Sequence, residues 1–340
     1  MAIKKGLVSI VIINWNGTND LKDLLPSLEK VKYKNFETII VDHGSADGSI
    51  EYIKKNYPKI KLLEKKKNLG FALGNNVGVK EAKGEYILLL NNDTIVKPDF
   101  LLNLVDVIEN DNKIGVVQPK IIFADSKKLQ STGTYFTSTG FLYHTGYNKD
   151  PNLAKYNKRK EIFSANGSCM LIKREVIEKV GLFDKDFFLY FEETDFCWRV
   201  WLTGYKIIYE PKAAILHKGS RATKRLPSYF VNFHSFKNRI NTLIKNLGFL
   251  KLIKILPVHL FLCEAASISF LARGGIKVAL STQHAIFWNI FNLGRTLKKR
   301  KRVQEKIRKV EDKNIMPRVK RKVRLSYYYY LSKGLVNYKD

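Results

Sequence analysis

The chain has 340 residues and a net charge of +29, from 60 lysines and arginines against 31 aspartates and glutamates. Its 45% hydrophobic and 27% charged residues exclude a collagen-like, low-complexity or wholly disordered chain. The charge is uneven, because residues 221–340 hold 27 basic and 5 acidic residues; a nearly neutral body is followed by a basic segment that we expect to meet an anionic partner.

The first 120 residues alternate predicted strands with predicted helices. The apolar run 7–13 predicts a strand rather than a signal peptide, because it is short and no small-residue cleavage site follows it; we expect a cytoplasmic body. Apolar strands that alternate with amphipathic helices are typical of a mostly parallel α/β sheet flanked by helices. The predicted strands are 7–13, 36–41, 61–63, 86–90 and 114–117, and the predicted helices are 21–31, 49–56, 71–82 and 100–108.

The pattern is weaker further along the chain. Glycines alternate with aromatic residues in 124–162, which predicts a long, functional or mobile loop over the sheet edge. We expect substrate specificity to lie in residues 124–170. The rest of the body is predicted as a strand at 167–172, a helix at 175–180, an aromatic and acidic segment at 187–201 and a strand at 205–209.

Residues 226–340 predict a separate, basic and helical region. Its two apolar stretches, 255–272 and 278–294, contain one charged residue, Glu264, and are flanked by lysines and arginines. Three arrangements are compatible with this pattern: a hairpin on the membrane surface, one or two spanning helices, and a soluble helical subdomain. We expect a catalytic domain at 1–225 and a membrane-associating region at 226–340 that binds an anionic membrane surface.

Polar side chains follow three of the predicted strands, and they are Asn14, Asp42 and Asp93. Ligands of open α/β sheets bind along this edge, although each residue could equally cap an ordinary turn. Asp93 could hold one divalent metal together with diphosphate oxygens. His217 is a candidate second ligand or a buried structural histidine. The glycines of 70–78 weaken a helix by about 1 kcal/mol each, which indicates close approach of a ligand or of the sheet.

Three acids lie within four positions of the aromatic segment, and they are Glu192, Glu193 and Asp195. Carboxyl groups that are pressed together by apolar rings have raised pKa values, which suits a general base. Acids are also favoured at the N-terminus of a helix, so both interpretations can hold at once.

Taken in order, these motifs resemble family 2 glycosyltransferases, and most of all their rhamnosyltransferase-like branch. The resemblance spans about residues 7–220 and rests on six segments: 8–17, 41–45, 68–76, 90–93, 181–184 and 192–195. It implies a GT-A, Rossmann-like fold and a metal-dependent, inverting enzyme. Such an enzyme transfers a hexose, rhamnose among the candidates, from a nucleotide-diphosphate sugar to a hydroxyl of a glycan or lipid-linked acceptor in cell-surface polysaccharide synthesis.

Carried over residue by residue, the resemblance makes Glu193 the catalytic base, flanked by Glu192 and Asp195. It assigns Mg²⁺ or Mn²⁺ to Asp93, with His217 as a candidate second ligand. The nucleotide sugar would contact Asn14, Asp42, Gly44, Asn68, Gly70, Asn75, Asn76, Asn91 and Asn92. This sequence departs from the family pattern at three positions: His43 replaces the usual Asn, Asn92 replaces Pro or Asp, and Glu193 replaces the commoner Asp.

Two other functions are compatible with the charge. One is a nucleic-acid-binding protein, but no recognised motif is present and the basic runs lie beside apolar stretches, so we expect no nucleic-acid partner. The other is a catalytically inactive relative that only binds nucleotide sugars or an anionic membrane. The presence of acids at 42, 93 and 193 argues against it, because such a protein has no need of all three. We expect an enzyme at the inner face of the cell membrane, peripheral or monotopic.

Overall fold

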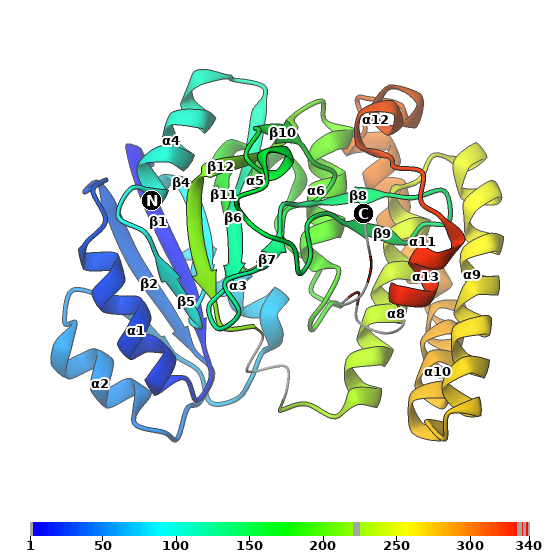
Figure 1. Ribbon diagram of the computed structural model, residues 1–340, viewed down its shortest axis with the longest axis horizontal. Coiled ribbons are helices and arrows are strands. Elements are labelled where there is room, and N and C mark those ends of the chain that lie inside the picture. The colour runs from blue at the N-terminus through cyan, green and yellow to red at the C-terminus, as the bar shows by residue number, and fades with distance from the viewer. Residues whose placement is uncertain (1–2, 220–224, 332–334, 336–337, 339–340) are drawn as a thin grey trace.

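A ten-stranded sheet lies at the centre of the residues that this computed structural model describes, which are 3–219, 225–331, 335 and 338 (Figure 1). Its strand order is β10-β12-β6-β11-β4-β1-β2-β3, with β5 on β12 and β7 on β6. The first four strands, which are parallel, are β1 (Lys4–Asn14), β2 (Phe36–Asp42), β3 (Lys61–Glu64) and β4 (Gly84–Asn91).

The other half of the sheet mixes strand directions. Strand β11 (Cys169–Lys173) runs antiparallel to β4 and to β6 (Ile114–Phe123), and β12 (Lys206–His217) runs parallel to β6. The short strands are β5 (Thr94–Val96), β7 (Leu129–Ser131) and β10 (Lys160–Glu161), and a separate hairpin pairs β8 (Thr134–Phe136) with β9 (Leu142–His144). The segment predicted as one long loop, 124–162, therefore holds four short strands and a 3₁₀ turn, Ala154–Tyr156. Strands of two or three residues are too short to show the alternation of apolar and polar side chains, over about four to eight residues, by which a strand is predicted from sequence.

Helices cover both faces of the sheet. Side chains alternate along β1, so Ile10 and Ile12 join one core while Val11 joins the other. The first core includes α1 (Thr18–Glu29), α2 (Ser49–Asn56) and α4 (Phe100–Asn110); the second includes α3 (Gly70–Lys80), α5 (Arg174–Val180) and α6 (Glu192–Leu202). The predicted α/β alternation is confirmed, and β6 and β12 extend beyond their predicted ends.

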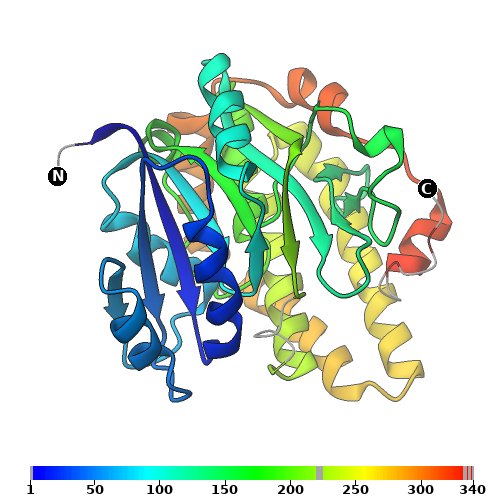
Figure 2. The same cartoon turned by 60° about the vertical axis from the view of Figure 1, so that its left-hand side comes forward.

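The C-terminal region packs against the body instead of trailing from it (Figures 1 and 2). Its elements are α8 (Ser228–Asn246), α9 (Phe249–Ala272), α10 (Ile276–Phe291), α11 (Leu293–Arg302), a π-helical turn (Val303–Ile307), α12 (Asp312–Val319) and α13 (Leu325–Leu331). Leu243, Ile255 and Val319 belong to the same core cluster as α6. The two predicted domains, 1–225 and 226–340, therefore share one hydrophobic core, and their division into separate domains stays a prediction.

Helices α9 and α10 form an apolar hairpin at the outer side of this region, on the right in Figure 1. Among the described residues, α9 is long and apolar enough by composition to cross a membrane. Glu264, the charged residue within the apolar stretch of α9, faces α10, because Gln283 Nε2 on α10 donates to Glu264 Oε2 at 2.6 Å. Large side chains that the hairpin exposes are Phe249, Leu250, Ile253, Val258, Phe261, Ile268, Leu271, Ile276, Leu280, Phe287, Ile290 and Phe291.

Candidate active site

The polar ends of β1 and β2 meet in one hydrogen-bonded cluster. Asn14 Nδ2 donates to Asp42 Oδ2 at 2.8 Å, and Asn92 Nδ2 donates to Asn14 Oδ1 at 2.8 Å. These contacts exist because β1 pairs in parallel with both β2 and β4, so the three carboxyl ends share one edge. Gly17 makes room for the cluster: a Cβ there would lie 2.2 Å from the amide nitrogen of Asn92.

Asp42 is fully buried and mostly satisfied within the protein. Its carboxylate accepts from Asn14, from the Ser45 backbone N–H at 2.8 Å and from Ser45 Oγ at 2.7 Å. A carboxylate offers about four acceptor positions, so about one remains for a nucleobase. In this conformation Asp42 chiefly holds the turn. Gly44, with φ +75°, lets that turn pass close to the carbonyls of Lys65 and Lys66.

Asp93 and His217 lie together at the neighbouring strand end. His217 Nε2 is 3.0 Å from Asp93 Oδ1, both side chains are buried, and the amide of Asn91 is 3.5 Å from the same nitrogen. His217 Nδ1 donates to Gln130 Oε1 at 2.6 Å, because an amide oxygen only accepts. The contact with Gln130, a residue of the 124–162 segment, was not foreseen from the sequence.

This donor set fits a divalent cation. When its proton is on Nδ1, His217 presents Nε2 as a donor atom 3.0 Å from Asp93 Oδ1, so a ring nitrogen and a carboxylate oxygen lie side by side where a cation could bind both. Histidine ligands of metals commonly donate their other N–H to an oxygen, which is the role of Gln130 here. Among the described residues no third His, Cys, Asp or Glu joins the pair, so further ligands would have to come from the donor or from water.

A pocket of 140 Å³ opens beside this cluster. Asn68 shapes its wall by accepting from the Gly70 backbone N–H at 2.8 Å and from His43 Nδ1 at 3.2 Å. Burial lowers the pKa of His43, so its buried Nε2 is an acceptor without a hydrogen-bond partner in the described part of the chain. The lining residues are Ile13, Trp15, His43, Asn68, Gly70, Phe71, Asn91, Asn92, Asp93, Phe188, Leu189 and Leu226.

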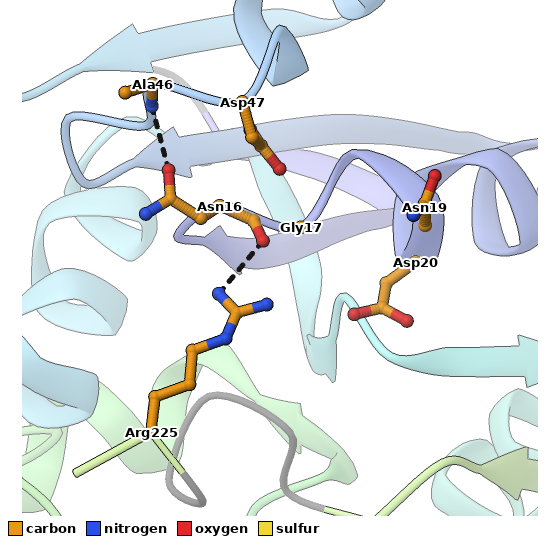
Figure 3. A pocket seen from close by; sticks show the side chains of 7 residues that line it. All are labelled: Asn16, Gly17, Asn19, Asp20, Ala46, Asp47 and Arg225. Atoms are coloured by element: carbon orange, nitrogen blue, oxygen red, sulfur yellow. Dashed lines mark hydrogen bonds between the residues drawn. The ribbon is translucent and has the colours of Figure 1, made fainter.

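A second cavity of 540 Å³ lies on the other side of the β1 turn (Figure 3). Arg225 reaches across it and donates to the backbone oxygen of Asn16 at 3.0 Å. The carboxylates of Asp20 and Asp47 also line the cavity. Arg225 was not predicted as a site residue. The signal in the sequence that could have indicated it is a basic cluster a few residues after His217, outside the long apolar stretches.

Asn75 and Asn76 are not among the residues that line the 140 Å³ pocket, and their contact with the nucleotide sugar stays a prediction. Asn75 Nδ2 donates to the Phe71 carbonyl one turn earlier at 2.9 Å. Asn76 joins α3 to Phe183 through two hydrogen bonds, from its amide at 2.9 Å and to its oxygen at 3.1 Å. The glycines of α3 serve the same packing, because a Cβ on Gly74 would meet the His43 ring at 2.6 Å.

Asp195 is directed away from Glu193 and packs against cations of the C-terminal region, so its catalytic role stays a prediction that these contacts do not support. It is fully buried, with Arg199 Nε at 3.1 Å, Lys245 Nζ at 3.0 Å and Asn246 Nδ2 at 2.9 Å. Positions two apart on a helix point about 200° apart, so Asp195 faces α8 while Glu193 faces the other way. Asp195 thus anchors α6 to the C-terminal region.

Removal of this charge is expected to destabilise the fold. Asp195→Asn should lower the free energy of unfolding in urea by about 3–5 kcal/mol, because Arg199 and Lys245 stay buried with an anion missing. Asp111→Asn is the matched control; its ion pair with Lys206 is partly exposed and should contribute less than about 1 kcal/mol. Equal losses in the two variants would contradict the anchoring role.

Glu192 and Glu193 start α6 and form the acidic pair of the site. Each has one buried carboxyl oxygen, Oε2, with no hydrogen-bond partner in the described residues. Burial raises the pKa of Glu193 to about 7, opposed by the backbone N–H groups of Glu193 and Thr194. Burial and then the charge of Glu193 raise the pKa of Glu192 well above its usual value. Gly167 lies close to both Glu193 and Phe71: a Cβ there would lie 3.9 Å from Glu193 Cβ and 3.3 Å from the Phe71 ring, and Phe71 lines the 140 Å³ pocket.

Solved structures share this architecture. The TarS fragment 1–349 from S. aureus in complex with UDP-GlcNAc superposes with a TM-score of 0.58 at 15% identity, covering 97% of this chain and 88% of that one. The mannosyltransferase PcManGT from Pyrobaculum calidifontis, in complex with GDP-Man and Mn²⁺, gives 0.52 at 17% identity, covering 87% and 84%. At these identities the likeness concerns the fold, which is the GT-A class of α/β fold.

Sequence comparison identifies the family. Residues 9–181, just over half of the 340, match the profile of Glycosyl transferase family 2. The chain belongs to this family, whose members use nucleotide-sugar donors. It is also 27% identical over 241 residues to the low-salt glycan biosynthesis hexosyltransferase Agl10 of Haloferax volcanii, covering 68% of this chain and 74% of Agl10. A rhamnosyltransferase branch is not singled out by these similarities.

Proposed function

We propose that this protein is an inverting, metal-dependent hexosyltransferase that extends a glycan or lipid-linked acceptor in cell-surface polysaccharide synthesis. Two observations support the proposal: Glu193 is an acid with a pKa of about 7 whose Oε2 has no hydrogen-bond partner in the described residues, and Asp93 lines the strand-end pocket together with Phe71. We place Glu193 at the acceptor side of that pocket. A base with a pKa near the working pH is ionised in a large fraction of molecules and still accepts a proton effectively.

The reaction follows from these positions. Glu193 takes the proton of the acceptor hydroxyl while that oxygen bonds to the anomeric carbon of the donor sugar. The bond from this carbon to the diphosphate breaks on the opposite face, so the anomeric configuration inverts in one displacement. Asp93 and His217 are the residues that would hold Mg²⁺ or Mn²⁺, and the bound ion supplies charge stabilisation to the leaving diphosphate.

The donor needs more space than the 140 Å³ pocket provides, because ligand sites for molecules of this size measure about 300–1,000 Å³. We place the sugar and diphosphate near Asp93 and the nucleoside toward Asn14, Asn68 and the 540 Å³ cavity. A loaded site would then require that Phe188, whose ring packs against Gly70, moves aside.

The activity is tested by a screen of nucleotide sugars. Thermal melting of the full chain is followed with UDP-, GDP-, dTDP- and CMP-linked sugars, each with and without Mn²⁺. We expect one nucleotide class to raise the Tm, more strongly with Mn²⁺, and the same donor to be hydrolysed slowly and released as the nucleoside diphosphate. A chain that responds to none of these donors, or binds one without any hydrolysis, would be a binding protein instead.

We also propose that the α9–α10 hairpin binds the anionic inner face of the cell membrane. Its exposed aromatic and aliphatic side chains lie between exposed cations, Lys251, Lys254, Arg273 and Lys277. Each cation near an anionic leaflet contributes about 1 kcal/mol, and each large apolar side chain that leaves water contributes about 1.5–3 kcal/mol. Such a position would bring a lipid-linked acceptor to the enzyme.

Flotation with anionic vesicles checks the membrane proposal. The wild-type protein is expected to remain bound in 1 M salt, whereas Phe261→Glu/Ile268→Glu should be released, since both exposed side chains would leave the lipid. Leu102→Glu, on α4 of the catalytic body, exposes a similar side chain and should behave as wild type. Release of the wild type by salt alone would limit the contact to electrostatic adsorption.

A further inference from the structure

The turn that precedes Glu193 has an unfavourable backbone conformation. Tyr190 and Phe191, two consecutive residues with side chains, have φ angles of +65° and +68°. This left-handed region is disfavoured for residues other than glycine, above all for bulky ones, and such strain persists only where the surroundings hold it. Phe191 is also the N-cap of α6, and its carbonyl accepts the first backbone hydrogen bond of that helix, from Asp195 at 2.8 Å.

A residue of the C-terminal region holds this turn. Asn238, fully buried on α8, donates from Nδ2 to the carbonyl of Leu189 at 2.9 Å and to that of Tyr190 at 2.7 Å. Its own oxygen, Oδ1, is buried without a hydrogen-bond partner in the described part of the chain. Rotating the amide by 180° would direct that oxygen at two carbonyl oxygens, which also only accept, so the orientation of the amide is fixed. The buried Oδ1 is left without a hydrogen bond, which costs free energy.

The rest of the segment is anchored at its other end. The Phe188 carbonyl accepts from the Phe71 backbone N–H at 2.7 Å, and Lys237 Nζ donates to the Asp186 carbonyl at 2.9 Å. Between these anchors and α6, Asn238 holds the backbone of Leu189 and of Tyr190, the first residue of the strained pair. A change at Asn238 therefore acts on the entry to α6, where Glu192 and Glu193 begin the helix.

We infer that Asn238 is a positioning residue: it holds Tyr190 and Phe191 in the left-handed conformation that directs Glu193 at the acceptor hydroxyl. The inference rests on the proposed function, since it assigns a task to the base. It also gives α8 a part in the chemistry, although no residue of α8 lines the 140 Å³ pocket.

The test compares Asn238→Ala with Asn232→Ala in transfer assays of the full chain. Asn232 lies on the same helix but bonds to α10, through Ser281 Oγ at 2.9 Å and Thr282 Oγ1 at 2.8 Å. We expect Asn238→Ala to lower kcat by about 100-fold with the donor KM unchanged, because a misplaced catalytic group costs about that much. Asn232→Ala should keep the wild-type kcat.

A second background separates positioning from general packing. Glycine adopts positive φ without steric cost. The fold-loss of kcat caused by Asn238→Ala should therefore be smaller in a Tyr190→Gly background than in the wild-type background, and the two losses should differ by more than about threefold. An equal loss in both backgrounds, or a folded Asn238→Ala with the wild-type kcat, would overturn the inference. If Asn238→Ala does not fold, Asn238→Asp keeps the size and removes both donors, and the same comparisons apply. Wild-type turnover in Glu193→Gln would instead remove the proposed base itself.

Discussion

Replacement of Glu193 by glutamine is expected to lower kcat by about 10²–10⁴-fold. The amide keeps the shape of the carboxyl group but cannot accept the proton of the acceptor hydroxyl. The donor does not depend on that proton transfer, so the melting shift caused by the nucleotide sugar should stay the same. Steady-state transfer assays and thermal melting measure the two quantities separately.

The dependence of kcat on pH is a second test of Glu193 as the general base. Burial raises the pKa of Glu193 to about 7, and only the ionised form acts as a base, so kcat should fall as the pH drops through about 7. That acidic limb should be absent from the residual activity of Glu193→Gln.

Glu192→Gln is the matched control for Glu193. Burial and the neighbouring charge raise the pKa of Glu192 well above its usual value, which favours the neutral carboxyl, and an amide resembles that form. Its loss of kcat should be far smaller than that of Glu193→Gln. If the two variants lost activity equally, or if Glu192→Gln alone abolished the acidic limb, the base would have to be reassigned to Glu192.

Replacement of Asp93 by asparagine should remove the response to Mn²⁺. Loss of the carboxylate leaves His217 without an anionic companion ligand, so Mn²⁺ should no longer raise the Tm of the nucleotide-bound protein, and kcat should fall by at least about 100-fold. Gln130→Leu removes only the hydrogen bond that orients His217 and should cost about 10–100-fold in Mn²⁺ affinity. Calorimetric titration of Mn²⁺ in the presence of the nucleotide measures both effects.

Asp99→Asn controls for a general effect of charge, because Asp99 is an exposed acid six residues further along the chain and forms an ion pair with Lys32. It should leave the Mn²⁺ response and kcat unchanged. Full activity of the wild type after extensive chelation, with Asp93→Asn equally active, would mean that Asp93 and His217 form an ion pair instead of a metal site.

Most of the body could be predicted from the sequence because each signal was local. A continuous apolar strand followed by an amphipathic helix specifies a parallel α/β unit, and parallel strands bring their carboxyl ends to one edge. Asn14, Asp42 and Asp93 are therefore predicted to lie at one edge. The use of most of the acceptor capacity of Asp42 by Asn14 and Ser45 depends on a turn conformation, which the sequence pattern does not specify.

The direction of helical side chains could have been anticipated better. Glu193 and Asp195, two positions apart, cannot face one crevice, and the 3.6-residue period was sufficient to show it. For Asn75 and Asn76 the period shows only that they differ in direction. That Asn76 bonds to the carbonyl of Phe183 depended on the fold, because Phe183 is more than one hundred residues away in the chain.

The sequence by itself determined the sheet and the family, because hydrophobic periodicity and short motifs are encoded by neighbouring residues. Only the tertiary structure decided how residues 226–340 are used. Their composition fits a detached membrane segment as well as a packed one, and the choice depends on long-range pairs such as Asp195 with Lys245 and Asn238 with the Tyr190 carbonyl. Contacts between distant residues leave no periodic signal in a single sequence, so only the folded chain shows that α8 holds the turn before Glu193.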